Sequence, residues 1–558
     1  MTSDTVIPRI NEATHEVTNQ PPRFEDGFNA YATDTALREA VARENGAWGE
    51  EKLQRFGALC GDELYQVGFE ANENPPKPRI FDRYGHRINE VEFHPAYHRS
   101  MAIAKENGLH SLTWTGKQDG SQVVRSALTY MHNQFEAGTM CPITMTHACV
   151  PTLQKQPEIA KAWLPGILAN EYDPKCAPMD QKRGLTIGMG MTEKQGGSDV
   201  RSNTTRAYAL GNPGPGGEYE LVGHKWFFSA PMCDGWLVLA NSDGGLSCFL
   251  LPKWRPDGTR NAINVQRLKG KLGDWSNASS EVEFTGAFGW MVGEEGRGVP
   301  TIIEMVGQTR LDCMLGSAAL MRHATAQAIH HCSYREAFGK RLIEQPLMVN
   351  VLADLALESE ASLALTMRTA RAFDQAARGD EQSKMLARIL TPVGKYWVCK
   401  RAPAQVNEAQ ECLGGAGYVE EHIMPRLYRQ APLNSIWEGS GNVQCLDVLR
   451  AITRDPKTMD ALMEELKAPV GSNRHYDAHL DKLQKAFADR DNMEIRARRL
   501  SENVALALQA AVLIQAGNAS VSDAFCVSRL GGDSGLAFGT LPASADLHGI
   551  VERAAPRG

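Results

Sequence analysis

Hydrophobic positions along the chain change their period twice. From about Thr33 to Leu168 they recur every three to four residues, most clearly in 35–41 and 121–135, which predicts helices broken by Pro and Gly. Between about Gly184 and Trp290 the period becomes two. Short apolar or β-branched runs occur there at 204–210, 219–229, 236–241, 246–251, 263–267 and 280–285. Short strands so close together predict a β-sandwich or barrel of roughly 100 residues.

Helical spacing then returns and persists to about residue 516. Three long amphipathic stretches predict helices that pack as a bundle, with Pro392 and Pro403 as boundaries or kinks of the last one. These stretches are 311–333, 346–373 and 383–413, and a further helical segment covers 456–516. The segment Pro75–Pro78 is predicted to be a loop, and Gly531–Gly535 belongs to a Gly- and Ser-containing tail.

This order predicts a mostly α, α+β protein built from five segments. An exposed polar arm (1–32) precedes a helical domain (33–183) and a β-domain (184–292). A helical bundle (293–455) and a helical extension (456–558) follow.

Composition narrows the function classes. The 558 residues are 42% hydrophobic and 22% charged, with a net charge of −7, so a nucleic-acid partner would need a local basic patch. The 12 cysteines include no CxxC pair and no metal-like cluster, which predicts reduced thiols in the cytoplasm and no metal site. Apolar runs stop short of the ~18 residues of a membrane span. Dinucleotide-binding GxGxxG, P-loop, HExxH and GxSxG patterns are missing.

The loop after the predicted strand at 185–188 is the first candidate for chemistry. It contains the adjacent glycines Gly196 and Gly197 and the hydroxyl side chains of Thr192 and Ser198. Glycines let backbone N–H groups approach a ligand, and the hydroxyls can bond its polar atoms. On local chemistry alone, however, an ordinary turn is the commoner meaning of such a loop.

Five motifs, each weak evidence by itself, indicate a family when their order and spacing are considered together. They are Met-Thr-Glu-Lys-Gln-Gly-Gly-Ser-Asp-Val (191–200), Gly-His-Lys-Trp-Phe-Phe-Ser (223–229), Arg-Glu-Ala-Phe-Gly (335–339), Gln-Glu-Cys-Leu-Gly-Gly-Ala-Gly-Tyr (410–418) and Ile-Trp-Glu-Gly-Ser-Gly-Asn (436–442). As a set spanning roughly residues 100–455, they resemble the acyl-CoA dehydrogenase superfamily. The wording of the first and last motifs, with the long terminal extensions, is most similar to its alkylation-response flavoproteins.

The resemblance implies bound FAD, a homotetramer, and a C-terminal helical domain associated with double-stranded DNA. It assigns cofactor contacts to Met191, Thr192, Gly197, Ser198, Trp226, Phe228, Ser229, Arg335, Phe338, Gln410, Gly414, Gly415, Trp437, Ser440 and Asn442. In this assignment, Trp226 packs on the flavin ring system, Ser229 bonds near N5, and Arg335 meets the pyrophosphate across a subunit interface. One departure is that Gln345 comes one position early, so that Pro346 occupies the usual glutamine position.

The same resemblance makes Glu438 the catalytic base. It would abstract the α-proton of a short or branched acyl-CoA while the β-hydrogen leaves as hydride to flavin N5. Ser198 and Arg310 are the implied substrate contacts. Burial beside Trp437 should raise the pKa of the carboxyl group, which suits proton abstraction. An isolated Glu-Gly pair would otherwise indicate a solvent-facing turn, and Arg429–Gln430, in place of the family's Arg-Asp, argues against ordinary β-oxidation substrates.

Positive residues cluster in the C-terminal extension and just before it. Arg450, Arg496, Arg498 and Arg499 are the candidate DNA contacts, and Arg496 and Arg499 are spaced to share a helix face. The alternative is a solvated helix face whose charge is balanced by nearby acidic residues, and with the resemblance taken into account the two interpretations are equally supported.

An ordinary acyl-CoA dehydrogenase of fatty-acid or amino-acid catabolism, without a DNA role, is the alternative function. A member of the fold that lacks the cofactor is a third hypothesis. The sequence identifies neither the substrate nor the electron acceptor.

Overall fold

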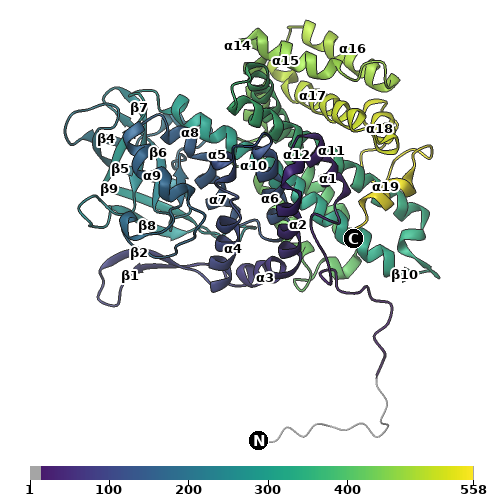
Figure 1. The fold of residues 1–558 in the computed structure, drawn as a ribbon, viewed down its shortest axis with the longest axis horizontal. Helices are drawn as coiled ribbons and strands as arrows, with labels where there is room; N and C mark the ends of the chain where they lie inside the picture. Colours follow the sequence, from purple (N-terminus) through teal and green to yellow (C-terminus); the bar gives the residue numbers. More distant parts are fainter. Residues whose placement is uncertain (1–13, 557–558) are drawn as a thin grey trace, which may run out of the picture.

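A computed structural model describes residues 14–556, in which a β-domain lies beside a large helical body (Figure 1). The body is organised around three long helices, α10 (Gly298–Tyr334), α11 (Pro346–Ala377) and α12 (Glu381–Glu411), which pack against one another. The predicted α+β, mostly α fold is therefore confirmed. Of the predicted arm, residues 1–13 lie outside the described part of the chain.

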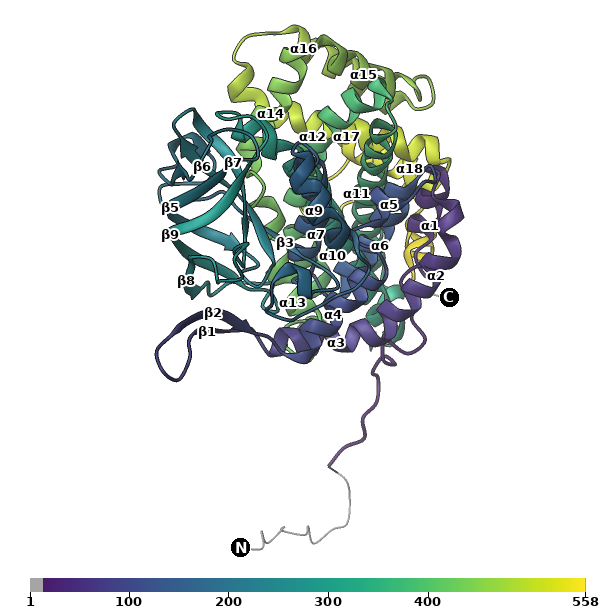
Figure 2. The same cartoon turned by 60° about the vertical axis from the view of Figure 1, so that its left-hand side comes forward.

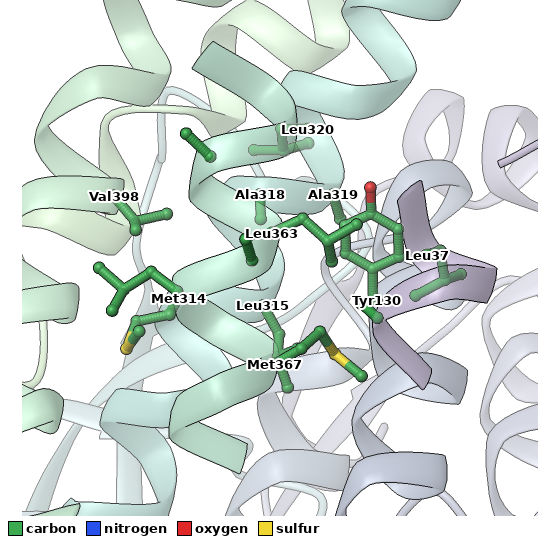
Figure 3. Packing of buried hydrophobic residues seen from close by; sticks show 14 of the residues in the cluster. Leu37, Tyr130, Met314, Leu315, Ala318, Ala319, Leu320, Leu363, Met367 and Val398 are labelled. Carbon is green, nitrogen blue, oxygen red and sulfur yellow. The ribbon is translucent and has the colours of Figure 1, made fainter. Parts of the chain in front are cut away.

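Helix α10 is apolar around most of its circumference because other helices surround it. Leu315, Ala318 and Ala319 are buried among side chains from neighbouring helices, including Tyr130 and Leu363 (Figure 3). A helix with this environment shows no single apolar stripe. Its sequence therefore predicts that a buried helix exists but does not define where the helix begins and ends. The observed helix indeed begins at Gly298, earlier than the predicted start at Leu311.

The N-terminal region wraps helices around α10 and α11. Its order is α1 (Thr35–Arg43), α2 (Glu50–Leu59), α3 (Tyr65–Glu73), α4 (Pro95–Glu106), α5 (Leu112–Thr115), α6 (Ser121–Phe135), α7 (Met140–Ala148), α8 (Val150–Leu153) and α9 (Pro157–Leu168). One prediction here is wrong. The loop expected at Pro75–Pro78 leads into strand β1 (Lys77–Phe81), which forms a hairpin with β2 (Arg87–Glu92). Strand β1 is mostly exposed and β2 mostly half-buried, and neither carries the apolar alternation that would reveal a strand.

The β-domain closes into a barrel. Its strands are β3 (Ile187–Gly190), β4 (Arg206–Ala209), β5 (Glu218–Ser229), β6 (Gly235–Ser242), β7 (Gly245–Pro252), β8 (Ile263–Leu268) and β9 (Ser279–Val292). Pairing runs β6-β4-β5-β9-β7 and returns to β6, with β3 and β8 added outside this ring. Each predicted short run corresponds to a strand, and the structure resolves the choice between sandwich and barrel.

The remaining helices follow α12 along the chain. They are α13 (Met424–Gln430), α14 (Gly441–Arg454), α15 (Pro456–Lys467), α16 (Arg474–Ala488), α17 (Met493–Ala516), α18 (Ala519–Phe525) and α19 (Leu547–Ala554). Of these, α14 to α18 lie together in the upper part of both views (Figures 1 and 2). Helix α12 continues through Pro392 and Pro403, so neither proline is a helix boundary. No helix within residues 14–556 is both long enough and apolar enough to cross a membrane.

Candidate active site

A short loop between helices α13 and α14 carries Glu438 in an unusual backbone conformation. Glu438 has φ of +57° and Gly439 has φ of +94°, both in the left-handed region. Such a conformation costs a non-glycine residue about 1–3 kcal/mol and persists only where surrounding contacts impose it. The buried Lys395 of α12 supplies them, because its Nζ donates to the carbonyl oxygens of Trp437 (2.7 Å) and Gly439 (2.6 Å).

The Glu438 side chain is held from helix α10. Thr309 Oγ1 donates a hydrogen bond to Glu438 Oε2 at 2.7 Å. Burial raises the pKa of Glu438, while the Thr309 hydroxyl and the charges of Lys395 and Arg310 oppose this shift. A carboxylate with a raised pKa is a stronger base than one in water, so Glu438 has the properties that its predicted role requires.

Arg310, a predicted substrate contact, forms bonds within the protein instead. Its Nε donates to the Glu438 carbonyl oxygen (3.1 Å), and its Nη1 pairs with Asp447 Oδ2 (2.9 Å). Asp447 also pairs with Arg388, at 2.7 Å between Nη2 and Oδ1. Arg310 is mostly buried, and these bonds make it a positioning residue for the Glu438 loop.

Glu438 faces a cavity enclosed by four parts of the chain. Helices α6 and α7 form one wall, helix α10 another, and the Glu438 loop with the end of α13 a third; the β-domain closes it through Ser229 and Asp274. The lining residues are Asn133, Ala137, Met140, Cys141, Thr144, Met145, Ser229, Asp274, Thr309, Asp312, Cys313, Gly316, Leu320, Gln430, Asn434, Trp437 and Glu438. Of the predicted site residues, the structure thus brings Ser229, Trp437 and Glu438 together.

The end of strand β5 contains an irregularity that decides where Phe228 points. The register shifts between Lys225 and Phe228, and this irregularity lets both side chains point into the barrel. Phe228 is fully buried, with its ring 5.1 Å from that of Trp236 between centroids. The Phe228 side chain is therefore turned into the barrel interior, and the assignment of Phe228 to the cofactor stays a prediction that only its backbone could fulfil.

Phe227 is the aromatic residue that the sequence analysis missed. It lies two residues before Ser229, hence on the same strand face, and half of its side chain is exposed. Trp226, predicted to pack on the flavin, is half-buried and carries Lys269 Nζ 3.4 Å from its ring centroid. Strand alternation counted back from Ser229 was the signal that could have identified Phe227.

The glycine-containing loop is fixed by a buried ion pair. Glu193 Oε1 accepts a hydrogen bond from Lys225 Nζ at 2.8 Å, and both side chains are fully buried. Burial alone would raise the pKa of Glu193, but the charge and hydrogen bond of Lys225 lower it to about 2. Trp226 N also donates to Thr192 O (2.8 Å), so the loop is bound to strand β5 at two points.

The loop residues assigned to the cofactor vary in exposure. Met191 and Thr192 are half-buried and Ser198 is exposed. A Cβ on Gly197 would come within 2.5 Å of Thr192 Oγ1, so this close packing requires glycine. The loop therefore keeps its predicted shape, and its contacts with a ligand stay a prediction.

The remaining cofactor candidates lie away from the cavity. Arg335 and Phe338 belong to the hairpin β10 (Glu336–Ala337)–β11 (Lys340–Arg341), at the opposite edge of the molecule from the β-domain (Figure 1). Arg335 Nη1 donates to Asn19 O (2.7 Å), and Phe338 is fully exposed. Gln410 Nε2 donates to Gly417 O (2.7 Å). Within one chain, these residues do not share a pocket with Glu438.

Ser440 and Asn442 lie at the start of helix α14, and the structure connects them with the C-terminal extension. Asn442 Oδ1 accepts a hydrogen bond from Arg498 Nε at 2.7 Å. Arg498, predicted to contact DNA, thus lies beside a predicted cofactor residue. Arg496 is occupied differently, with Nη1 paired to Asp489 Oδ2 (2.6 Å) and Nη2 donating to Ala486 O (2.8 Å).

Two separate parts of the chain suit the extended, phosphate-bearing cofactor that the resemblance implies. Gly414 has φ of +59°, and a Cβ added at Gly414 or Gly415 would meet nothing within 4 Å, which leaves open backbone for a diphosphate to approach. Ser229 and Trp437 line the cavity between the barrel and the bundle, where a flat ring system would fit.

Comparison with known proteins identifies the family. Three family models match in order: the adaptive response protein AidB N-terminal domain over residues 19–174, the acyl-CoA dehydrogenase middle domain over 188–287, and the acyl-CoA dehydrogenase C-terminal domain over 296–453. The putative acyl-CoA dehydrogenase AidB of Escherichia coli K12 is 46% identical, covering 92% of this chain and 94% of that protein. The chain belongs to the acyl-CoA dehydrogenase family. It is an FAD-dependent oxidoreductase of the AidB-like type.

Relatives outside bacteria and solved structures agree with this assignment. Acyl-CoA dehydrogenase family member 11 of Caenorhabditis elegans is 30% identical, covering 81% of this chain and 75% of that protein. The crystal structure of Caenorhabditis elegans ACDH-11 in complex with C11-CoA has a TM-score of 0.83 at 26% identity, covering 94% of this chain and 92% of the other. An acyl-CoA dehydrogenase from Bacillus anthracis complexed with FAD shares the fold, with a TM-score of 0.67 at 16% identity, over 93% of this chain and 89% of that one.

Proposed function

We propose that this protein dehydrogenates a short or branched acyl-CoA between the α and β carbons, with Glu438 as the base. The main support for this proposal is the position of the Glu438 carboxylate. It lines the cavity between the barrel and α10, and burial raises its pKa. Thr309 holds Oε2, which leaves Oε1 to take the α-proton. FAD, when bound, supplies the acceptor for the two electrons and the β-hydrogen. Lys395 and Arg310 keep the carboxylate aimed at the substrate.

Replacement of the base tests this proposal. Glu438→Gln should retain FAD and lower the rate of flavin reduction by about 10²- to 10⁴-fold, the usual contribution of a positioned general base. The measurement is flavin absorbance after anaerobic mixing with a panel of acyl-CoA thioesters. FAD-loaded parent protein that is not bleached by any member of the panel would contradict the proposal.

We propose double-stranded DNA binding as a second function, carried by the exposed cations of α14, α16 and α17. Arg450, Arg498 and Arg499 are exposed, as are Lys482 and Arg490. Within residues 14–556, none of these five side chains forms an ion pair with a carboxylate, unlike Arg496. Helix α17 is in contact with both α14 and α16, which supports a shared cationic surface. Unpaired surface cations are free to neutralise phosphates.

The salt dependence of duplex binding tests the second function. Removing one side chain that neutralises a phosphate should reduce the slope of log K against log salt by about 0.9. Arg450→Gln and Arg499→Gln should each do so, while Arg55→Gln, at an exposed arginine of α2, should leave the slope unchanged. Equal slopes for all four proteins would exclude this surface as the DNA site.

The proposal extends to assembly, location and domain limits. Arg335 and the fully exposed Phe338 flank strand β10, at the opposite edge of the molecule from the β-domain that borders the Glu438 cavity, which supports a homotetramer in which they serve the FAD of a neighbouring subunit. The proposal also includes a cytoplasmic location and domain boundaries after residues 32, 183, 292 and 455. Light scattering of the FAD-loaded protein would give four chains per particle, and a monomer would contradict it.

A further inference from the structure

Within residues 14–556, two buried side-chain atoms of residues that line the cavity have no hydrogen-bond partner. They are Oδ1 of Asp274 and Nε2 of Gln430, and both residues line the cavity. Only 5% of Asp274 and 4% of Gln430 is exposed. Buried polar groups are almost always hydrogen-bonded, so two unsatisfied atoms on one cavity wall point to a ligand that bonds them.

The two residues belong to neighbouring segments. A Cβ on Gly273 would lie 3.0 Å from Gln430 Cα and 2.7 Å from Arg429 O, so the loop before Asp274 rests on the end of α13. Lys271 Nζ donates to Asn277 O (2.6 Å), which fixes this loop on its other side. Asp274 and Gln430 are therefore held close together.

Other polar side chains of the cavity are already bonded. Asn434 Oδ1 accepts from Trp437 Nε1 (3.0 Å), Thr144 Oγ1 donates to Asp312 Oδ2 (2.6 Å), and Asn133 Nδ2 donates to Thr129 O (2.9 Å). Among the described residues that line the cavity, Asp274 and Gln430 are thus the ones with a buried side-chain atom that lacks a hydrogen-bond partner.

The cavity that Asp274, Gln430 and Glu438 share extends along helix α10. It follows helix α10 from Thr309, beside Glu438, to Leu320. At about 1.5 Å per residue this distance is roughly 16 Å. A substrate whose α-carbon lies at Glu438 can therefore place a distal substituent deep in the cavity.

The chemistry of the two atoms selects the substituent. Gln430 Nε2 can only donate a hydrogen bond. Burial raises the pKa of Asp274 to about 6 against the charge of Lys271, so near neutral pH the ionised carboxylate accepts. A hydroxyl group donates and accepts, whereas an alkyl end leaves both atoms unsatisfied and a carboxylate is repelled by Asp274.

We propose that the acyl chain bound in this cavity carries a hydroxyl group, held between Asp274 Oδ1 and Gln430 Nε2. The inference rests on the proposed acyl-thioester function and names its substrate class, hydroxyacyl-CoA.

Paired ligands test the inference on the FAD-loaded protein. Each member of a short series of ω-hydroxyacyl-CoA thioesters is compared with the acyl-CoA in which a methyl group replaces the hydroxyl. Dissociation constants come from isothermal titration, which does not depend on turnover. At least one hydroxyl member should bind about tenfold or more tighter than its methyl counterpart, since one satisfied pair of hydrogen bonds is enough for that ratio.

Variants connect the preference to the two residues. Gln430→Leu and Asp274→Asn should reduce the hydroxyl-to-methyl ratio to about twofold or less, without weakening the methyl ligand. Gln515→Leu, the same exchange at an exposed position of α17, should keep the parent ratio. Flavin content and thermal unfolding confirm that each variant is folded.

The outcomes separate this inference from the function on which it rests. Equal or tighter binding of the methyl ligands throughout the series overturns the hydroxyl site and leaves the dehydrogenase proposal standing. An unchanged ratio in both variants also overturns it. If no acyl-CoA binds the FAD-loaded protein, the proposed function itself fails. Should the variants not fold, the comparison of ligands on the parent protein decides alone.

Discussion

At the residue scale, the reactivity of Glu438 is set by its immediate neighbours. Its backbone is held in a left-handed conformation by bonds from Lys395 to the adjoining carbonyl groups. Burial makes the carboxyl group harder to ionise, and the Thr309 hydroxyl partly reverses that effect. The base is therefore tuned by two opposing contributions that can be altered one at a time.

Thr309→Val should shift the pH dependence of catalysis. In the proposed mechanism the ionised form of Glu438 is the base, so flavin reduction should accelerate as pH rises through its pKa, which lies above the ordinary value of 4.5. Loss of the hydroxyl removes an interaction that lowers this pKa, so the midpoint should move to higher pH. Rapid-mixing rates across pH measure it.

Thr309→Ser is the matched control, because it keeps the hydroxyl and removes only a methyl group. Its midpoint should stay with that of the parent protein. A midpoint that stays fixed in Thr309→Val, or moves to lower pH, would show that the Thr309 hydroxyl does not stabilise the carboxylate.

At the element scale, the Glu193–Lys225 pair joins the glycine-containing loop to strand β5. Lys225 Nζ bonds both Glu193 and the Leu239 carbonyl oxygen of β6 (2.8 Å each), so one side chain links three segments of the barrel. Removing one member of a buried pair leaves an uncompensated charge, which costs far more than removing both.

Lys225→Met should lower the free energy of unfolding by about 3–5 kcal/mol, the usual cost of an unpaired buried charge. The double variant with Glu193→Gln should recover much of that loss. Because the pKa of Glu193 is lowered to about 2, the pair stabilises the fold above pH 4.5 and ceases to do so as pH falls towards 2. Denaturant unfolding at several pH values measures both effects, and equal stabilities of the single and double variants would contradict them.

At the scale of the whole molecule, the C-terminal extension is built into the bundle. Helix α17 packs against α11, α12 and α14, and it buries Val504 and Leu508 completely. Trp397 Nε1 donates to Gln509 Oε1 (3.1 Å), and Arg553 of α19 pairs with Glu360 of α11. The extension completes the hydrophobic core besides presenting a charged surface.

Deletion of residues 456–558 should therefore destabilise the entire protein. The cut would expose the apolar surfaces of α11, α12 and α14 that α17 now covers, at roughly 25 cal/mol per Å² of apolar surface. The expected result is aggregation or a large drop in melting temperature, measured by light scattering and thermal unfolding. A truncated protein as stable as the parent would contradict it. DNA binding is consequently better tested with Arg450 and Arg499 substitutions than with a truncation.

The sequence determined much of the fold because local periodicity records which face of each element is buried. It predicted helix α6 at its observed limits, Ser121–Phe135, and every strand of the barrel close to its position. It also placed Glu438 in a loop whose ordered motifs indicated the family. These features depend on residues close together in the chain, so they can be inferred without the tertiary structure.

Only the tertiary structure decided which side chains meet. One irregularity in β5 buries Phe228 and exposes Phe227, because a one-residue shift exchanges the two faces of a strand. The Arg498–Asn442 bond and the approach of the Asp274 loop to Gln430 join residues far apart in sequence. Local periodicity contains no record of such contacts, since they arise from the packing of whole elements. The sequence therefore determined the architecture and the position of the proposed base, and the packing determined the surroundings of the cavity that Glu438 lines.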